Sequence, residues 1–277
     1  MCINNTRPQL TDLRCLSGQG NVSIPLDLAV LTDLETFQVS YFNIVGGLEV
    51  FQALPSLKEI DLAENGLEGS IEQILDSLVS NKTKSVSLGG NPGLTGEVPW
   101  ESIGELSALH LPRTGVSIGH VPSGLESYSL EVFDFSSNLL DEFPVDLFRF
   151  RKMAKLDLSH SQMKGTIPED IRHWNATLTS LVLDSNSLEG SIPLAFDYLT
   201  ALGKILLVYK HGCISFIPHR DPSILTPTEI LKIQGNQLTG TISDAICRER
   251  GLRKNQLSSL LVDCRLVFCF CCDGEGC

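Results

Sequence analysis

Apolar residues recur along the chain in pairs whose two members are separated by one position. This spacing is typical of a short, half-buried strand, and successive pairs begin 23 to 29 residues apart. The first members of the pairs are Leu13, Phe37, Ile60, Val86, Leu109, Phe133, Leu156, Leu181, Ile205, Leu231 and Leu260. No single helix or strand has such a period. The pattern therefore indicates a solenoid in which each unit is one turn of a coil.

The stretch SLKEIDLAENGLEGSI, residues 56–71, shows one unit in full. We predict that its apolar side chains point inward and stack on those of adjacent turns. These side chains are Leu57, Ile60, Leu62, Leu67 and Ile71. Because each unit carries one strand-like pair, the turns should together form a parallel sheet along one side of the coil.

Five units carry an asparagine after the pair, in register or nearly so: Asn65, Asn91, Asn138, Asn186 and Asn236. The chain must turn sharply after each strand, which leaves backbone groups inside the coil that no regular ladder satisfies. A side-chain amide both donates and accepts hydrogen bonds. We therefore expect a column of asparagines that closes these bonds between turns.

The consensus L-x-x-L-x-L-x-x-N-x-L-x-G-x-I-P resembles the plant-type leucine-rich repeat of receptor-like proteins and receptor-kinase ectodomains, with tails such as LTGEVP and MKGTIP. The ending ISDAICRERGLRKNQLSSLLVDCRLVFCFCCDGEGC is similar to the Cys-rich cap of extracellular leucine-rich repeat proteins of diatoms. The resemblance implies an α/β-type solenoid, a leucine-rich repeat horseshoe of about eleven units with a parallel β-sheet on its concave face and a Cys-rich C-terminal cap.

The same resemblance implies a ligand-binding or adhesive ectodomain, often tethered to a membrane. The first functional hypothesis is recognition of a protein, peptide or glycan by the concave face, with a co-receptor as a further partner. The alternative is a structural or adhesive cell-surface glycoprotein without a discrete ligand site. A cytosolic scaffold is a third reading, which disulfides in the cap would exclude.

We expect residues 1–12 to be the remnant of an N-terminal cap, residues 13–246 the repeats, and residues 247–277 the last strand and the Cys-rich cap. The N-terminus shows neither a signal peptide nor the usual Cys-containing cap. No run of about 18 apolar residues occurs, so no membrane-spanning segment is predicted. Our hypothesis is that the chain is a fragment that lacks its cap and targeting segment.

Six of the nine cysteines lie near the C-terminal end: Cys247, Cys264, Cys269, Cys271, Cys272 and Cys277. An even cluster in a short cap predicts three disulfides, for which about 15 pairings exist. A zinc site is the alternative, although paired C-x-x-C knuckles and a companion histidine are lacking. Cys15 takes an inward strand position, so we interpret it as a small buried hydrophobe, and the states of Cys2 and Cys213 stay open.

Four N-x-S/T sequons occur, at Asn4, Asn21, Asn81 and Asn175. Asn81 and Asn175 precede their strands by a few residues in two lengthened units, so glycans there should project from one flank and leave the strand face clear. Together with the Cys-rich end, the sequons favour an oxidising compartment and an extracellular or cell-surface location.

The formal net charge of −12 and the pI near 4.9 argue against a nucleic-acid partner, which would need a basic face. Asp61, Asp134 and Asp157 take the same strand position and could suggest acid–base chemistry, but a solvated face is the better interpretation. His110 and His160 (with His211) fall on or near that face without a clear nucleophile–base–orienter arrangement. No enzyme, cofactor or metal site is predicted.

The column of residues between the two inward positions begins acidic and becomes apolar late in the chain. We predict a ligand site where this change occurs, made of Val182, Asp184, Leu206, Val208, Tyr209, Lys210 and Lys232. An exposed apolar patch with polar residues around it is typical of a binding surface. Drift of an irregular repeat without functional consequence is the alternative.

Overall fold

Each turn of the coil is built from three-residue strands, short helical segments and tight bends. The computed structural model describes residues 20–80, 82–125, 128–199, 201, 230–232, 235–242 and 267–269. The chain divides into two compact units, Met1–Asn138 and Leu139–Cys277. Seven of the predicted strand-like pairs lie fully within the described residues, and in each the first member lies in a strand and both apolar residues are buried. The first members of these pairs are Phe37, Ile60, Val86, Leu109, Phe133, Leu156 and Leu181.

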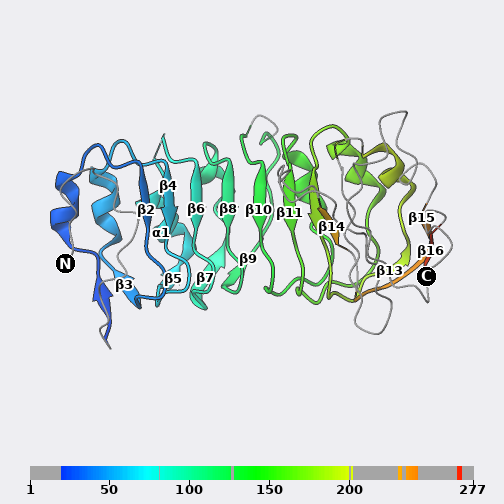
Figure 1. Ribbon diagram of the computed structural model, residues 1–277, viewed down its shortest axis with the longest axis horizontal. Helices are drawn as coiled ribbons and strands as arrows, with labels where there is room; N and C mark the ends of the chain where they lie inside the picture. The colour runs from blue at the N-terminus through cyan, green and yellow to red at the C-terminus, as the bar shows by residue number, and fades with distance from the viewer. Residues whose placement is uncertain are drawn as a thin grey trace, which may run out of the picture. The chain divides into compact units, whose positions relative to one another are not determined.

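The main sheet of the first unit is parallel, and each turn adds one strand to it (Figure 1). In its described residues this sheet has the order β2 (Thr36–Gln38), β4 (Glu59–Asp61), β6 (Ser85–Ser87), β8 (Ala108–His110) and β10 (Val132–Asp134). Neighbouring strands pair without offset, so equivalent residues of successive turns stand side by side. The register therefore converts the sequence repeat into straight columns of side chains.

A second strand, which was not predicted, comes from the L-x-G tail in several of the described turns. In the first unit β1 (Val22–Ser23) pairs with β3 (Ile44–Gly46), and a separate sheet has the order β5 (Glu68–Ser70), β7 (Gly93–Glu97) and β9 (Gly115–Ser117). The tail has no regular apolar alternation, because its residues lie largely exposed and only Leu94 and Val116 of β7 and β9 are buried. Its strand character comes from backbone pairing rather than from a hydrophobic face.

Short helices close the turns between the two kinds of strand. In the first unit these are the 3-10 helices η1 (Leu26–Val30), η2 (Leu48–Ala53) and η3 (Trp100–Ile103), and the α-helix α1 (Ile71–Leu78). Helix α1 buries Ile71, Ile74, Leu75 and Leu78. This i, i+3, i+4, i+7 spacing places all four on one face, which explains why this turn alone among the described ones has a full α-helix.

The second unit repeats the plan. Its main sheet has the order β11 (Lys155–Asp157), β12 (Ser180–Val182) and β14 (Ile230–Lys232), and its second sheet the order β13 (Glu189–Ser191), β15 (Gln237–Ile242) and β16 (Val267–Cys269). The 3-10 helices are η4 (Val145–Arg149), η5 (Glu169–Trp174) and η6 (Leu194–Tyr198).

In the second unit the pair at Ile205 and Leu207, which was predicted to form a strand, lies outside the described residues. Strand β12 pairs directly with β14, with Val182 opposite Lys232. The amide of Asn236 likewise bonds to the turn of Asn186, since its Nδ2 donates to Leu183 O at 2.9 Å.

The predicted inward residues form the core. Leu57, Ile60, Leu62, Leu67 and Ile71 are all at most 1% exposed. In another turn Phe133 and Phe135 take the positions of Ile60 and Leu62 and stack with ring centroids 5.6 Å apart. On the helical side of the second unit Trp174 of η5 packs on Phe148 of η4 at 4.6 Å. Apolar burial along a continuous column of this kind is the main source of stability in a repeat protein.

The asparagine column is confirmed. The Asn91 Nδ2 donates to Leu88 O of its own turn at 2.7 Å and to Leu62 O of the preceding turn at 3.0 Å, while its Oδ1 accepts from Leu67 N at 3.0 Å. Asn138 and Asn186 repeat this arrangement, and both are buried. Each amide thus joins backbone groups of two turns that no sheet satisfies.

Two turns lack the asparagine and use a hydroxyl in its place. The Thr114 Oγ1 donates to Leu111 O at 3.1 Å, and the Ser161 Oγ donates to Ser159 O at 3.0 Å. A hydroxyl has a single proton to donate. The hydroxyl can therefore replace one of the two hydrogen bonds that the amide donates. The Oδ1 of the asparagine in the following turn accepts from the backbone N–H of Thr114 and of Ser161.

Candidate ligand-binding surface

The main sheet of the first unit presents a continuous polar column on its outward side. The last residues of its strands stand in register and are, from turn to turn, Gln38, Asp61, Ser87, His110 and Asp134. All five are at least partly exposed. The alternation of buried and outward residues along each strand places them opposite the apolar core.

A hollow of about 240 Å³ lies on this surface, between β2 and β8. We call it the inner hollow, and its lining is Gln38, Glu59, Ile60, Asp61, Ser85, Ser87 and His110. The hollow has a physical origin in side-chain size, because the short Ser85 and Ser87 of β6 lie beside the longer Glu59 and Asp61 of β4. His110 of β8 lies on the other side of Ser87. The other lining residues are polar, and Ile60 is only 1% exposed, so the accessible part of the lining is almost entirely polar.

Lysines near the inner hollow are paired with other carboxylates. Lys58 Nζ lies 2.7 Å from Glu35 Oε1, and Lys84 Nζ lies 3.0 Å from Glu105 Oε2. Among the described residues, neither Glu59 nor Asp61 forms an ion pair within 4.0 Å. The hollow therefore carries negative charge that no ion pair among the described residues neutralises.

The strand-end aspartates also have a local structural role. Asp61 Oδ1 accepts from Ala63 N at 3.0 Å, and Asp134 and Asp157 accept in the same way from the backbone N–H two residues on. This bond holds the start of the sharp turn that follows each strand. It accounts for the recurring L-D-L pattern and uses one carboxylate oxygen of Asp61, so the remaining oxygen is available to a ligand.

Among the described residues, Asp134 is a carboxyl whose surroundings clearly shift its pKa. Burial alone would raise the pKa of this carboxyl, but a hydrogen bond from His110 and bonds from the Ser136 N–H and hydroxyl lower it more, so that its pKa lies below the ordinary value. The His110 Nδ1 lies 4.0 Å from Asp134 Oδ2, and the Ser136 Oγ lies 2.8 Å from Oδ1. The charged form of Asp134 is therefore the one that the folded protein favours.

Stability should accordingly fall in acid in a way that depends on Asp134. A carboxyl with a depressed folded pKa stabilises the protein above its unfolded pKa of about 4, and this contribution disappears as the pH falls through the folded pKa. We expect the free-energy difference between the wild type and Asp134→Asn to be constant near neutral pH and to shrink below about pH 4. Urea unfolding at a series of pH values measures this difference. A difference that stays constant down to the acid limit would contradict the assignment.

Ser87, His110 and Asp134 stand side by side on three strands, in an order that resembles a hydrolase triad. Among the described residues no hydrogen bond joins Ser87 to His110, and the row lies on an open sheet face without paired N–H donors for an oxyanion. The described residues of this row therefore lack the geometry of a nucleophile with its base, and they offer hydrogen-bonding groups on the outward side of the sheet.

A second column follows the strands, at the residue before each asparagine position. These residues have positive φ angles and are Tyr41, Glu64, Gly90, Arg113, Ser137, His160, Ser185 and Gly235. In the first unit Glu64 and Arg113 form an ion pair across the intervening turn. Gly90 stands between them, and a Cβ on Gly90 would lie 2.5 Å from the Glu64 Cδ. The missing side chain is therefore what allows the two charges to meet beside the inner hollow.

Gly90→Ala should destabilise the protein by about 1–2 kcal/mol, since alanine at φ +69° is strained and its methyl group would displace the Glu64 carboxylate. Gly165→Ala is a matched control, because Gly165 has φ +76° but no atom within 4 Å of its added Cβ. Chemical denaturation of both variants separates the cost of backbone strain from the cost of displacing the Glu64 carboxylate. Equal losses for the two substitutions would show that the ion pair contributes nothing.

Known proteins have repeats and folds similar to those of this chain. The family described as Leucine Rich Repeat matches residues 177–199. Receptor like protein 24 of Arabidopsis thaliana is 28% identical over 230 residues, which cover 72% of this chain and 25% of that protein. The chain thus has the repeat pattern and the fold of plant-type leucine-rich repeat proteins. It spans about a quarter or less of the length of the first curated relatives that it matches.

Solved structures share the fold of this leucine-rich repeat protein. The Arabidopsis receptor kinase HAESA, in complex with the peptide hormone IDA and the co-receptor SERK1, has a TM-score of 0.55 at 23% identity, with 87% of this chain and 44% of that chain covered. A plant ice-binding protein has a TM-score of 0.57 at 23% identity, with 90% and 72% covered. At these identities the likeness shows the repeat architecture, which both proteins have in common with this chain.

Most of the ligand patch predicted from the sequence of this leucine-rich repeat protein lies outside the described residues, namely Leu206, Val208, Tyr209 and Lys210. The backbone of Lys232 lies in β14, beside Val182. Val182 and Asp184 were expected to be exposed, but each is only 8% exposed. The Asp184 carboxylate is covered in part by His160, whose Nε2 lies 3.7 Å from Oδ2. The patch as a ligand site stays a prediction.

The inner hollow was not predicted from the sequence, in which Asp61 was interpreted as part of a solvated face. Its signal in the sequence is the change of side-chain size between adjacent units, from Glu59 and Asp61 to Ser85 and Ser87. That signal becomes visible only when the units are aligned in register, since the four residues are far apart along the chain.

Of the predicted modification sites, Asn21 and Asn175 lie in the described part of the chain and are exposed. Asn4 and Asn81 lie outside it. Cys269 belongs to β16, which pairs with Gly240–Ile242 of β15, and the other five cysteines of the predicted cap lie outside the described residues. No cluster of metal-binding side chains occurs within the described residues, nor any helix long and apolar enough to cross a membrane.

Proposed function

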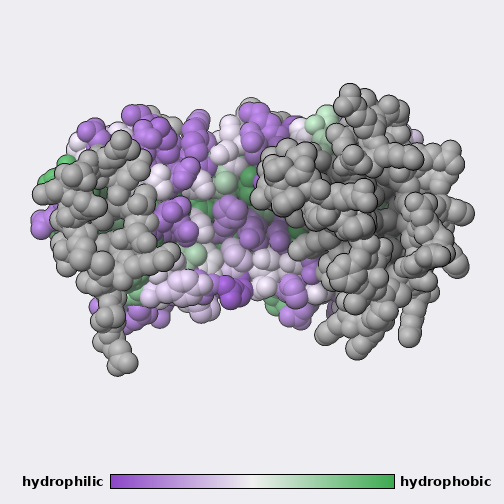
Figure 2. All heavy atoms as spheres, viewed as in Figure 1, coloured by the Kyte–Doolittle hydropathy of each residue, from purple (hydrophilic) through white to green (hydrophobic). Residues whose placement is uncertain are grey.

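We propose that this chain is the ligand-binding part of an extracellular or cell-surface protein, and that it recognises a peptide along the main sheet of its first unit. The observation that carries the proposal is the inner hollow, an acidic depression of about 240 Å³ on a polar face. Figure 2 shows hydrophilic side chains over much of the surface that is not drawn in grey. A polar face with one depression suits a ligand that lies across several strands.

The size of the inner hollow favours one inserted side chain. Sites that enclose a whole small molecule have volumes of about 300–1,000 Å³, and the hollow is smaller than that range. An extended peptide that crosses the strands would place a single side chain there and lay its backbone over Ser87 and His110. The neighbouring polar column offers both donors and acceptors to such a backbone.

The charge of the inner hollow favours a basic side chain. Glu59 and Asp61 lie at its wall without an ion-pair partner among the described residues, and an arginine can bind two carboxylate oxygens at once. The formal net charge of −12 would also draw cationic peptides toward the protein. HAESA, which shares the fold, is solved with a peptide hormone and a co-receptor, and a peptide ligand with a co-receptor is accordingly the partner set that we propose.

Selection from a library of random peptides tests the proposal. The full chain, secreted from a eukaryotic host and immobilised, should enrich peptides that contain arginine or lysine, and their binding should weaken as the salt concentration rises. Enrichment of peptides without a basic residue, or the failure of the chain to retain any peptide, would contradict it.

A further inference from the structure

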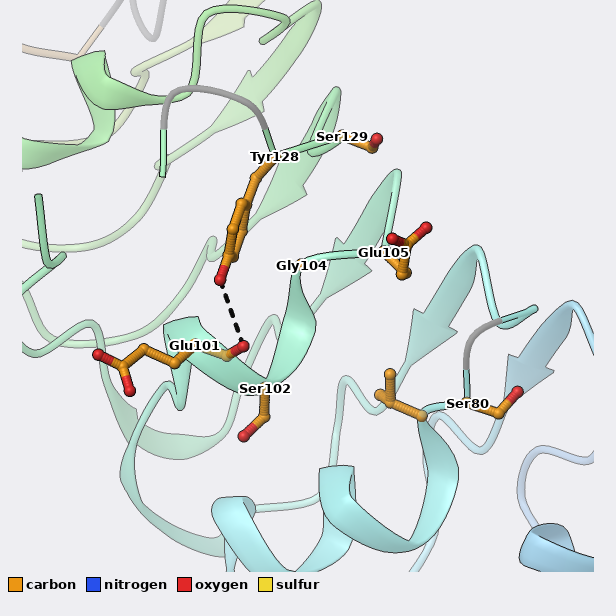
Figure 3. A pocket seen from close by; sticks show the side chains of 8 residues that line it. Ser80, Glu101, Ser102, Gly104, Glu105, Tyr128 and Ser129 are labelled. Atoms are coloured by element: carbon orange, nitrogen blue, oxygen red, sulfur yellow. Dashed lines mark hydrogen bonds between the residues drawn. The ribbon is translucent and has the colours of Figure 1, made fainter. Parts of the chain in front are cut away.

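A second and larger pocket lies on a flank of the first unit, away from the inner hollow. It has a volume of about 460 Å³ and is formed by residues 79–80, 101–105 and 128–129 of three successive turns (Figure 3). We call it the flank pocket. Its segments precede β6, β8 and β10, so it lies at the ends of the strands opposite to those that carry Asp61 and His110.

The flank pocket exists because neighbouring turns differ in their outer layer. One turn carries the eight-residue α1 and the next the four-residue η3, while the turn after that has no helical segment in its described residues. The outer layer therefore becomes thinner from turn to turn. The resulting step leaves Gly104 and the face of the Tyr128 ring beside an open space.

Tyr128 is held in place as an aromatic wall. Its ring packs against Gly104, where an added Cβ would lie 3.0 Å from the ring carbon Cζ. Its hydroxyl donates to Glu101 O at 3.4 Å, as Figure 3 shows. The glycine thus permits close contact between the ring and the backbone, and the hydrogen bond fixes the direction of the ring. A preoriented aromatic face of this kind offers apolar contact at low entropic cost.

The rest of the flank pocket is rich in oxygen atoms. Hydroxyl groups come from Ser80, Ser102 and Ser129, and carboxylates come from Glu101 and Glu105. Among the described residues that line it there is no lysine or arginine. Lys84 neutralises Glu105 at 3.0 Å from outside the lining. The described residues contain no group of three potential metal ligands, so this set of oxygens is not arranged for an ion.

We propose that the flank pocket binds a neutral sugar, with N-acetylglucosamine units as the fitting chemistry. The ring C–H face of the sugar packs on Tyr128, and its hydroxyl and amide N–H groups donate to the serine and carboxylate oxygens. An anionic ligand is disfavoured because the lining carries two carboxylates, of which Lys84 pairs with only one. A volume of about 460 Å³ falls within the range of small-ligand sites.

Two sources can supply such a sugar. Ser80 of the lining directly precedes the sequon at Asn81, so a glycan attached there begins next to the flank pocket in the sequence. A free oligosaccharide is the other source. Both present the same chemistry to Tyr128, and the two are distinguished by whether removal of the Asn81 glycan opens the site.

The test is titration of the full chain with N,N′-diacetylchitobiose, followed by ligand-observed NMR. The secreted glycoprotein and its Asn81→Gln variant are compared. Binding to the variant alone identifies the chain's own glycan as the natural occupant, and binding to both identifies a free oligosaccharide. Either result supports the proposal, with a dissociation constant expected in about the millimolar range. Absence of binding to both forms overturns it.

Substitutions of Tyr128 locate the binding. Tyr128→Ala in the Asn81→Gln background should weaken chitobiose binding about tenfold or more, whereas Tyr128→Phe keeps the ring and should stay within about threefold. Tyr198→Ala, at a tyrosine that is 60% exposed in the second unit, is the matched control and should change nothing. An unchanged affinity in Tyr128→Ala would show that the sugar binds elsewhere and would overturn the assignment.

Discussion

Asn91→Ala should lower the free energy of unfolding by about 2–4 kcal/mol, the largest effect that we expect from one polar substitution. Asn91 is fully buried, and its amide serves the Leu67 N–H and the Leu88 carbonyl at 3.0 and 2.7 Å. Alanine would leave both backbone groups without a partner inside the coil. Equilibrium denaturation by urea, monitored by circular dichroism, measures the loss.

Two further variants make this prediction specific. Asn65 makes the same kinds of bonds, to Val39 O at 2.8 Å and from Phe42 N at 3.1 Å, but it is only half-buried. Water can reach these groups, so Asn65→Ala should cost about half as much. Asn91→Thr should recover part of the loss, because Thr114 already replaces an asparagine in this way. A greater loss at Asn65 than at Asn91 would refute the account of the column.

Neutralising the inner hollow should weaken the binding of a basic peptide by about 1–3 kcal/mol. The double variant Glu59→Gln/Asp61→Asn removes both charges and keeps their shapes. The new asparagine can still accept the hydrogen bond from Ala63 N, which Asp61 Oδ1 accepts at 3.0 Å in the wild type, so the turn after β4 should survive. Calorimetric titration with a peptide selected from the library measures the change.

The matched control is Glu68→Gln/Glu97→Gln. These glutamates are exposed on β5 and β7 of the second sheet, and their removal changes the net charge by the same amount. If long-range attraction alone governed binding, both double variants would weaken it equally. We expect the control to bind within about twofold of the wild type at moderate salt. Equal losses would place the ligand outside the inner hollow.

The repeat, its inward residues and the asparagine column could be predicted from sequence because each depends on local spacing. Leu57, Ile60 and Leu62 stand within one unit, and their burial follows from the strand and the turn that this unit forms. Asn91 was predicted for the same reason, since every turn has the same backbone groups to satisfy. Because the same spacing recurs from unit to unit, the structure predicted for one unit could be applied to the others.

Features that depend on neighbouring units could not be predicted in this way. The second strand of several turns, such as β5 with β7, has no apolar alternation and arises from backbone pairing. The direct pairing of Val182 with Lys232, which are 50 positions apart in the numbering, was not predicted either. The inner hollow comes from differences in side-chain size between adjacent turns, and the flank pocket from differences in the length of their helical segments. A consensus sequence does not record such differences.

Photo-cross-linking of a selected basic peptide tests the central claim most directly. A peptide whose basic residue is flanked by benzoylphenylalanine should, after irradiation and mass mapping, be attached to β4, β6 or β8, within the segments 59–61, 85–87 and 108–110. The free peptide without the photoreactive group should compete with the attachment. Cross-links on β5 and β7, or around Val182 and Lys232 where the sequence alone predicted the site, would contradict recognition by the inner hollow.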